Sequence, residues 1–104
     1  MAENIYELLI GKWKNDCNDL ESIRMYGNTM LEFIDNNRLV YHIYQNDKEQ
    51  IINLTYKIRG NILITNQPSL PTREKTQFKI INNKELILIY DNIKVKYIKD
   101  IKII

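Results

Sequence analysis

The sequence is poor in the residues that carry most metal and covalent chemistry. Among 104 residues it has one cysteine, Cys17, and one histidine, His42. A single cysteine excludes a disulfide within the chain. No Cys/His/Asp/Glu spacing supplies a metal-ligand set, and no nucleophile motif accompanies the histidine. The sequence therefore predicts neither a metal site nor a cofactor, and enzyme activity is the least supported class of function.

Glycine, charge of one sign and long apolar runs are also scarce. Three glycines form no glycine-rich phosphate loop, and a net charge of +2 gives no electrostatic argument for nucleic acid or a membrane surface. No run approaches the roughly 18 apolar residues that span a bilayer. Residues 1–4 lack the basic start and apolar stretch of a signal peptide. We expect a cytoplasmic protein with no membrane insertion.

The sequence is rich in the alternating pattern that is typical of β-strands. From Leu31 to Tyr97, short runs of alternating apolar and polar side chains are separated by Asn, Asp or Gly turns, and Gly60-Asn61 is a two-residue hairpin signal. Tight connections predict antiparallel neighbours. About eight such strands remove their exposed edges by closing on themselves, so residues 1–104 are predicted to form one small all-β, antiparallel up-and-down barrel.

A short helix is expected ahead of these strands. Within residues 3–10, Ile5, Leu8 and Leu9 form one apolar stripe, and Gly11 ends it. A helix this short has to dock on the rest of the protein. Residues 16–27 are expected to form a loop, with a short strand or a helical turn.

The order of these elements resembles the calycin superfamily, which comprises lipocalins, fatty-acid-binding proteins and short bacterial lipocalin-like proteins. The matching segments are the helix before Gly11-Lys12-Trp13, the hairpin over 56–64, and Glu85-Leu86-Ile87-Leu88 followed by Tyr97-Ile98-Lys99. The resemblance implies that Trp13 packs at the closed end of the barrel under a basic residue of the last strand, Lys99 or Lys96. It also implies binding of a small ligand inside the barrel.

An interior formed by about eight strands is either just filled by side chains or holds one small ligand. If it is hollow, large side chains on the inward faces line the cavity for a small apolar or amphipathic ligand, with tyrosine hydroxyls meeting its polar end. Core filling is the default interpretation of the same aromatic side chains. The candidate ligand-binding residues are Phe33, Tyr41, Leu54, Tyr56, Phe78 and Tyr90.

The segment 66–73 supports a second hypothesis. Leu70 stands between Pro68 and Pro71, with Arg73 close behind. Loops on rigid scaffolds often carry function. The segment is a lid at the barrel mouth, a plain connection, or the contact loop of a protein-binding module of the inhibitor or immunity type, with Leu70 and Arg73 as contact residues. In either case the protein is expected to be a monomer or a homodimer.

A third hypothesis concerns polar residues on neighbouring strands. Glu32, Arg38, His42 and Tyr44 fall near one another across the hairpin that joins the strands around 31–44. Together with other tyrosines they would form the site of a barrel enzyme if they faced inward. An outward-facing, solvated polar patch is the favoured interpretation.

Overall fold

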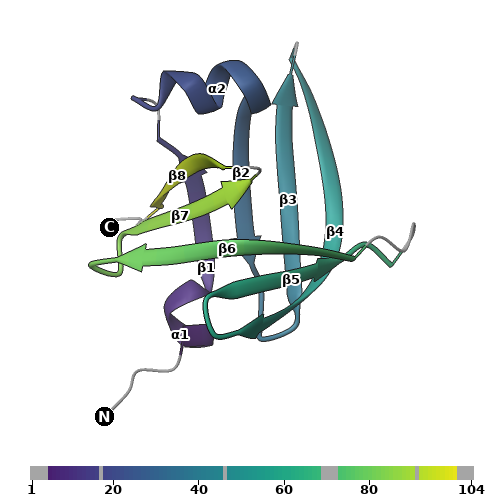
Figure 1. The fold of residues 1–104 in the computed structure, drawn as a ribbon. Coiled ribbons are helices and arrows are strands. Elements are labelled where there is room, and N and C mark those ends of the chain that lie inside the picture. The colour runs from purple at the N-terminus through teal and green to yellow at the C-terminus, as the bar shows by residue number, and fades with distance from the viewer. Residues whose placement is uncertain (1–4, 17, 46, 69–72, 91, 101–104) are drawn as a thin grey trace, which may run out of the picture.

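The chain folds into one closed barrel with a helix at each end (Figure 1). A computed structural model describes residues 5–16, 18–45, 47–68, 73–90 and 92–100. The elements in order are α1 (Ile5–Leu9), β1 (Gly11–Asn15), α2 (Leu20–Tyr26), β2 (Asn28–Phe33), β3 (Arg38–Gln45), β4 (Lys48–Arg59), β5 (Ile62–Asn66), β6 (Arg73–Ile81), β7 (Glu85–Tyr90) and β8 (Ile93–Lys99).

Each strand pairs antiparallel with the next along the chain, and β1 pairs with β8 to close the barrel. The prediction of an eight-stranded up-and-down barrel with a short N-terminal helix is therefore confirmed. The turns use residues that tolerate unusual backbone angles. Gly60 has a φ of 62° between β4 and β5, and Asn82 and Asn83 have φ of 52° and 58° between β6 and β7. Glycine and asparagine adopt positive φ at the lowest steric cost.

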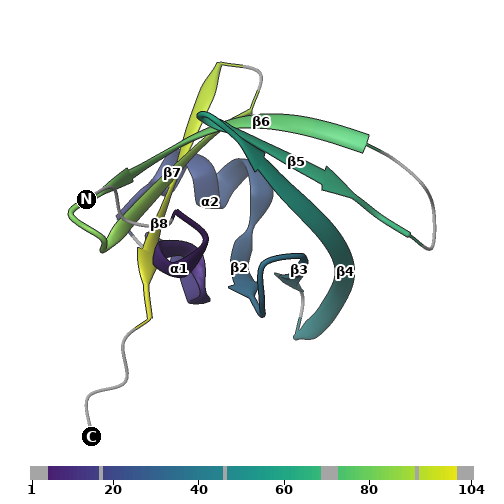
Figure 2. The ribbon, with the colours of Figure 1, turned by 90° about the horizontal axis from the view of Figure 1, so that it is seen from below.

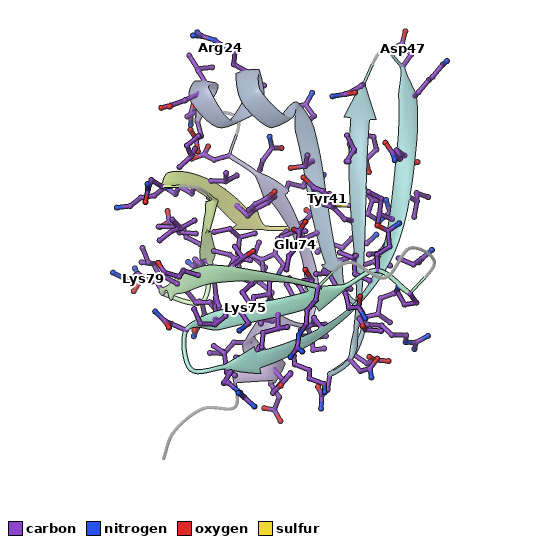
Figure 3. The ribbon with its side chains drawn as sticks, turned by 45° about the vertical axis from the view of Figure 1, so that its right-hand side comes forward. Arg24, Tyr41, Asp47, Glu74, Lys75 and Lys79 are labelled. Atoms are coloured by element: carbon purple, nitrogen blue, oxygen red, sulfur yellow. The ribbon has the colours of Figure 1, made fainter. Side chains whose placement is uncertain are left out.

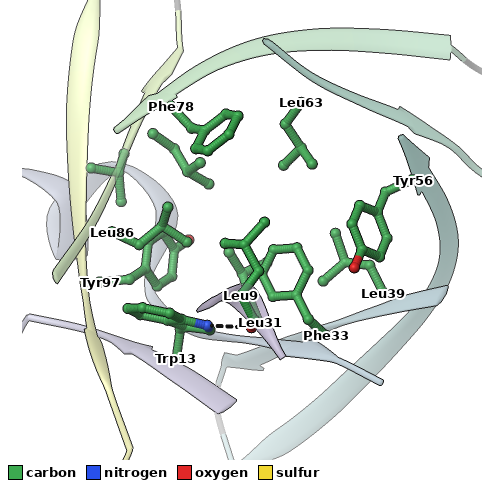
Figure 4. Packing of buried hydrophobic residues seen from close by; sticks show 12 residues of the cluster. Leu9, Trp13, Leu31, Phe33, Leu39, Tyr56, Leu63, Phe78, Leu86 and Tyr97 are labelled. Carbon is green, nitrogen blue, oxygen red and sulfur yellow. Dashed lines mark hydrogen bonds between the residues drawn. The ribbon is translucent and has the colours of Figure 1, made fainter. Parts of the chain in front are cut away.

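The helix α1 closes one end of the barrel, where it lies between β8 and β2 (Figure 2). The side chain of Trp13 is 0% exposed, and its indole Nε1 donates a hydrogen bond of 2.8 Å to the carbonyl of Leu9 (Figure 4). The Nζ of Lys99 lies 5.4 Å from the indole centroid and donates to the carbonyl of Leu8. Lys99 is thus the basic residue that lies over Trp13.

The core packs above this closed end. Alternating side chains of the strands meet inside the barrel, as the register requires. Leu9 of α1 completes the cluster from below. The buried members are Leu9, Trp13, Leu31, Phe33, Leu39, Tyr56, Leu63, Phe78, Leu86, Leu88, Val95 and Tyr97 (Figure 4).

The second helix, α2, lies at the opposite end (Figure 1). The sequence predicts a loop over 16–27 with a short strand or a helical turn, and the structure forms a helix of seven residues within it. Contacts with the last strand hold this segment, since the amide of Lys96 donates to the carboxylate of Asp19, and the amide of Asp16 donates to the carbonyl of Lys96.

Replacing Trp13 tests how the closed end is held. Trp13→Ala removes a fully buried side chain, so we expect the free energy of unfolding to fall by about 3–5 kcal/mol. Lys99→Met keeps the covering aliphatic chain and loses only the cation–π contact and one hydrogen bond, so we expect a loss of about 1 kcal/mol. Urea unfolding followed by circular dichroism measures both, and a Trp13→Ala loss no larger than that of Lys99→Met would contradict this view.

Candidate functional site

The inner wall of the barrel is filled at the α1 end, and along β3 and β4 it is partly exposed toward the other end. Along β3, inward-facing Leu39 is 2% exposed, whereas Tyr41 is only half-buried. Along β4, inward-facing Tyr56 is 2% exposed, Leu54 is half-buried, and Gln50 is exposed. We call the exposed part of the inner wall the open half. Its members are Tyr41, Ile43, Gln50, Ile52, Leu54, Thr65 and Glu74.

The open half is apolar along its wall and polar at its rim. Figure 3 shows Tyr41 and Glu74 in the region that separates β3 from β6. Thr65 lies directly across from Glu74 in the β5–β6 pair. Thr29 lies directly across from Ile43 in the β2–β3 pair but is buried, and its hydroxyl lies 2.9 Å from that of buried Tyr97 in a mutual hydrogen bond. The wall therefore offers hydrocarbon contact, with an amide (Gln50) near the tip of the β3–β4 hairpin and a hydroxyl and a carboxylate (Thr65 and Glu74) at the β5–β6 pair.

A hollow adjoins this part of the wall at the tip of the β3–β4 hairpin. Its volume is about 380 Å³, and it is lined by Ile43, Gln45, Lys48, Glu49 and Gln50. Ile43 and Gln50 are paired in the register and belong to the open half. The hollow thus lies at the rim beside the inner face of the hairpin.

The structure separates the residues predicted to line a cavity. Phe33, Tyr56 and Phe78 are buried in the packed core, while Tyr41 and Leu54 lie partly exposed in the open half. The backbone of the sixth candidate, Tyr90, belongs to β7, and its side chain lies outside the described part of the chain. Sequence reasoning did not single out the isoleucines of the open half, although their alternation with Tyr41 and Leu54 was the available signal.

Tyr56 is held within the core by its hydroxyl. The hydroxyl donates a 2.6 Å hydrogen bond to the carbonyl of Asp35, and the ring meets Phe33 edge-on at 5.1 Å between centroids. Burial raises the pKa of Tyr56 to about 12, and nearby Tyr6 and Asp35 add to the shift. This tyrosine therefore acts as a packed structural residue with a satisfied hydroxyl.

The polar residues of the enzyme hypothesis lie on the outer face of the barrel. Nδ1 of His42 is 2.8 Å from a carboxylate oxygen of Glu49, and its buried Nε2 is 3.5 Å from a carboxylate oxygen of Glu32. The ring of Tyr44 stacks on His42 at 6.3 Å, and burial together with the charges of Glu49 and Glu32 raises the pKa of Tyr44. Arg38 pairs instead with Asp35 at 2.8 Å, which keeps it out of this group.

This outer cluster joins three strands, because its members come from β2, β3 and β4. Within the residues that the structure describes, no group of three or more His, Cys, Asp or Glu side chains could hold a metal ion. The cluster therefore forms polar contacts between neighbouring strands on the outer wall of the barrel.

Of the two predicted partner-contact residues, Leu70 lies outside the described residues, as does Cys17. Arg73 is exposed at the start of β6 and borders an outer hollow of about 370 Å³. None of the described residues that line this hollow carries a carboxylate, and its second cation is Lys57. The lining residues are Asn37, Thr55, Tyr56, Lys57, Ile64, Asn66 and Arg73.

Comparison with known proteins identifies no relative of this chain. No protein-family model, curated protein or solved structure matches the chain. Neither helix among the described residues has the length and apolar character needed to cross a membrane.

Tyr56 predicts how stability depends on pH at the alkaline end. The folded state holds the phenol proton up to a pKa of about 12, whereas the unfolded chain releases it near the ordinary value of 10.0. The stabilisation that comes from holding this proton is complete below pH 10.0, the pKa of the unfolded chain. It is lost as the pH rises from there toward the folded-state pKa of about 12. Urea unfolding of the wild type and of Tyr56→Phe at pH 9 and pH 11 should show a steeper loss for the wild type, and equal losses would contradict the assignment.

Proposed function

We propose that the protein is a non-enzymatic binding protein that holds one small amphipathic ligand in the open half of its barrel. The observation that supports this proposal is the gradient of exposure along the inner wall. Leu39 and Tyr56 are 2% exposed, whereas Tyr41 and Leu54, one inward position further along each strand, are half-buried. Small-molecule sites are typically concave and mostly apolar, with a few polar groups that fix orientation.

The chemistry of the open half suggests the class of ligand. Aliphatic or aromatic carbon would contact Tyr41, Ile52 and Leu54, which would bury apolar surface on both sides. The polar end of the ligand would meet Thr65 and Glu74, which lie opposite each other in the β5–β6 pair. Because Glu74 has no ion pair among the described residues, a neutral or cationic head group fits this rim better than an anionic one.

We further propose that the chain is a lipocalin-like member of the calycin superfamily. Three features support this proposal: the up-and-down order of the closed barrel, the helix that caps one end, and the pairing of Trp13 with Lys99. In this interpretation the Trp13 end is the floor of the barrel and the open half is its ligand-binding mouth.

A second candidate function is binding of a protein partner, as an inhibitor or immunity-type factor. The hollow bordered by Lys57 and Arg73 favours it, because two cations flank a concave surface and none of its described lining residues is a carboxylate. Complementary charge speeds association and selects partners, so the partner expected here is acidic.

Two adjacent isoleucines on β4 provide a matched test of the ligand proposal. Ile52 faces inward in the open half, whereas Ile51 faces outward and is 54% exposed. Ile52→Trp fills the open half, so we expect it to weaken binding of Nile red, a neutral apolar dye, by about tenfold or more. Ile51→Trp adds the same volume outside and should leave the affinity unchanged.

Fluorescence titration measures both affinities, with circular dichroism as the check on folding. Saturable binding with one dye per chain, lost in Ile52→Trp alone, is the expected result. Equal binding by the two variants, or no saturable binding to the wild type, would contradict a site in the open half.

A further inference from the structure

One half of β4 has a strand partner on one side only. β4 has 12 residues and pairs with β3 through Lys48–Thr55, but β5 pairs only with Thr55–Arg59. Within the described residues, 48–54 therefore have no ladder partner on the β5 side. Figure 1 shows this half of β4 rising away from β5 and β6. Although the barrel is closed through its other strand pairs, it retains an open sheet edge here.

The backbone groups that face this edge follow from the strand geometry. The amide of Tyr56 donates 2.9 Å to the carbonyl of Asn37, on the β3 side of β4. Backbone groups of successive residues in a paired strand point to alternate sides. The N–H and C=O of Glu49, Ile51 and Asn53 therefore point to the side without a partner.

The side chains along this edge are exposed as well. Glu49, Gln50, Ile51 and Asn53 are all classed as exposed, and Ile51 is 54% exposed even though it is apolar. An edge strand with free backbone groups is a template for pairing with another strand. An isoleucine at its centre adds apolar area that such pairing would bury.

We propose that this edge is a homodimer interface in which two copies of β4 pair antiparallel about a two-fold axis at Ile51. In this register Ile51 lies opposite Ile51 of the second copy, and Glu49 lies opposite Asn53. All three residues direct their backbone groups to the edge, so each pair exchanges two hydrogen bonds. The interface is isologous, as closed dimers require.

The sequence of the edge fits a second copy. A glutamate meets an asparagine, an isoleucine meets an isoleucine, and no like charges face each other. A register shifted by two residues would set Glu49 opposite Ile51. Asn53 would then have no residue of the other copy's β4 opposite it. In the register centred on Ile51, the side chains of Glu49, Ile51 and Asn53 stay on the outer face of the barrel, as in the single copy. This proposal does not depend on a bound ligand.

Engineered cysteines test the register directly. In a Cys17→Ser background, Ile51→Cys places two thiols opposite each other, within the Cα separation of about 4.4–6.8 Å that a disulfide spans. Mild oxidation should link this variant into a covalent dimer. Asn53→Cys is the matched control, because the same residue of the two copies lies far apart in this register, and it should remain monomeric on non-reducing gels.

Charge substitutions supply a second measurement. Sedimentation equilibrium should show the wild type as a dimer, while Ile51→Lys and Ile51→Glu should each be monomeric and should form a heterodimer when mixed. Ile34→Lys, at another exposed isoleucine (42%), should leave the dimer intact. A wild type that stays monomeric at millimolar concentration, equal cross-linking of the two cysteine variants, or a dimer that persists in both charged variants would overturn the proposal.

Discussion

The contact between the Trp13 indole and the Leu9 carbonyl is the constraint on which the rest of the molecule depends. A five-residue helix has little stability of its own, and this hydrogen bond joins its last residue to the first strand of the barrel. Lys99 joins the last strand to the same end of the barrel, because its Nζ lies over the Trp13 indole and donates to the carbonyl of Leu8. One end of the barrel is thereby closed and filled, so any space for a ligand has to lie toward the other end.

A mismatch in strand length accounts for both the open half and the free edge. β4 has 12 residues and β5 has five, so β5 covers only the part of β4 nearest to α1. Where β5 is missing, the inward side chains Ile52 and Leu54 are partly exposed, and the backbone of Ile51 faces no described strand. Ligand access and strand pairing both use this uncovered part of β4: a ligand contacts its inward side chains, and a second copy pairs with the backbone groups of its edge.

The strands were predictable because alternation and turn residues are local signals. Gly60-Asn61 and the apolar positions of β6 define their elements without help from distant residues. The helix α2 was not predictable in the same way. Its Leu20 is 67% exposed, and the contacts that hold the segment reach Lys96, far along the chain. Alternation likewise predicts which face of the sheet a side chain occupies, but it does not predict how far along the barrel axis the residue lies. Tyr41 and Tyr56 look equivalent in sequence, yet only Tyr56 lies beside α1, with its ring 5.9 Å from Tyr6.

Native mass spectrometry of the untagged protein, purified gently from its own source, tests the proposal of an occupied open half most directly. The expected spectrum shows one retained small molecule for each 12.5 kDa chain, which is released on denaturation and is absent from Ile52→Trp. A spectrum of bare chains, unchanged by denaturation and identical in the variant, would contradict a ligand-binding barrel.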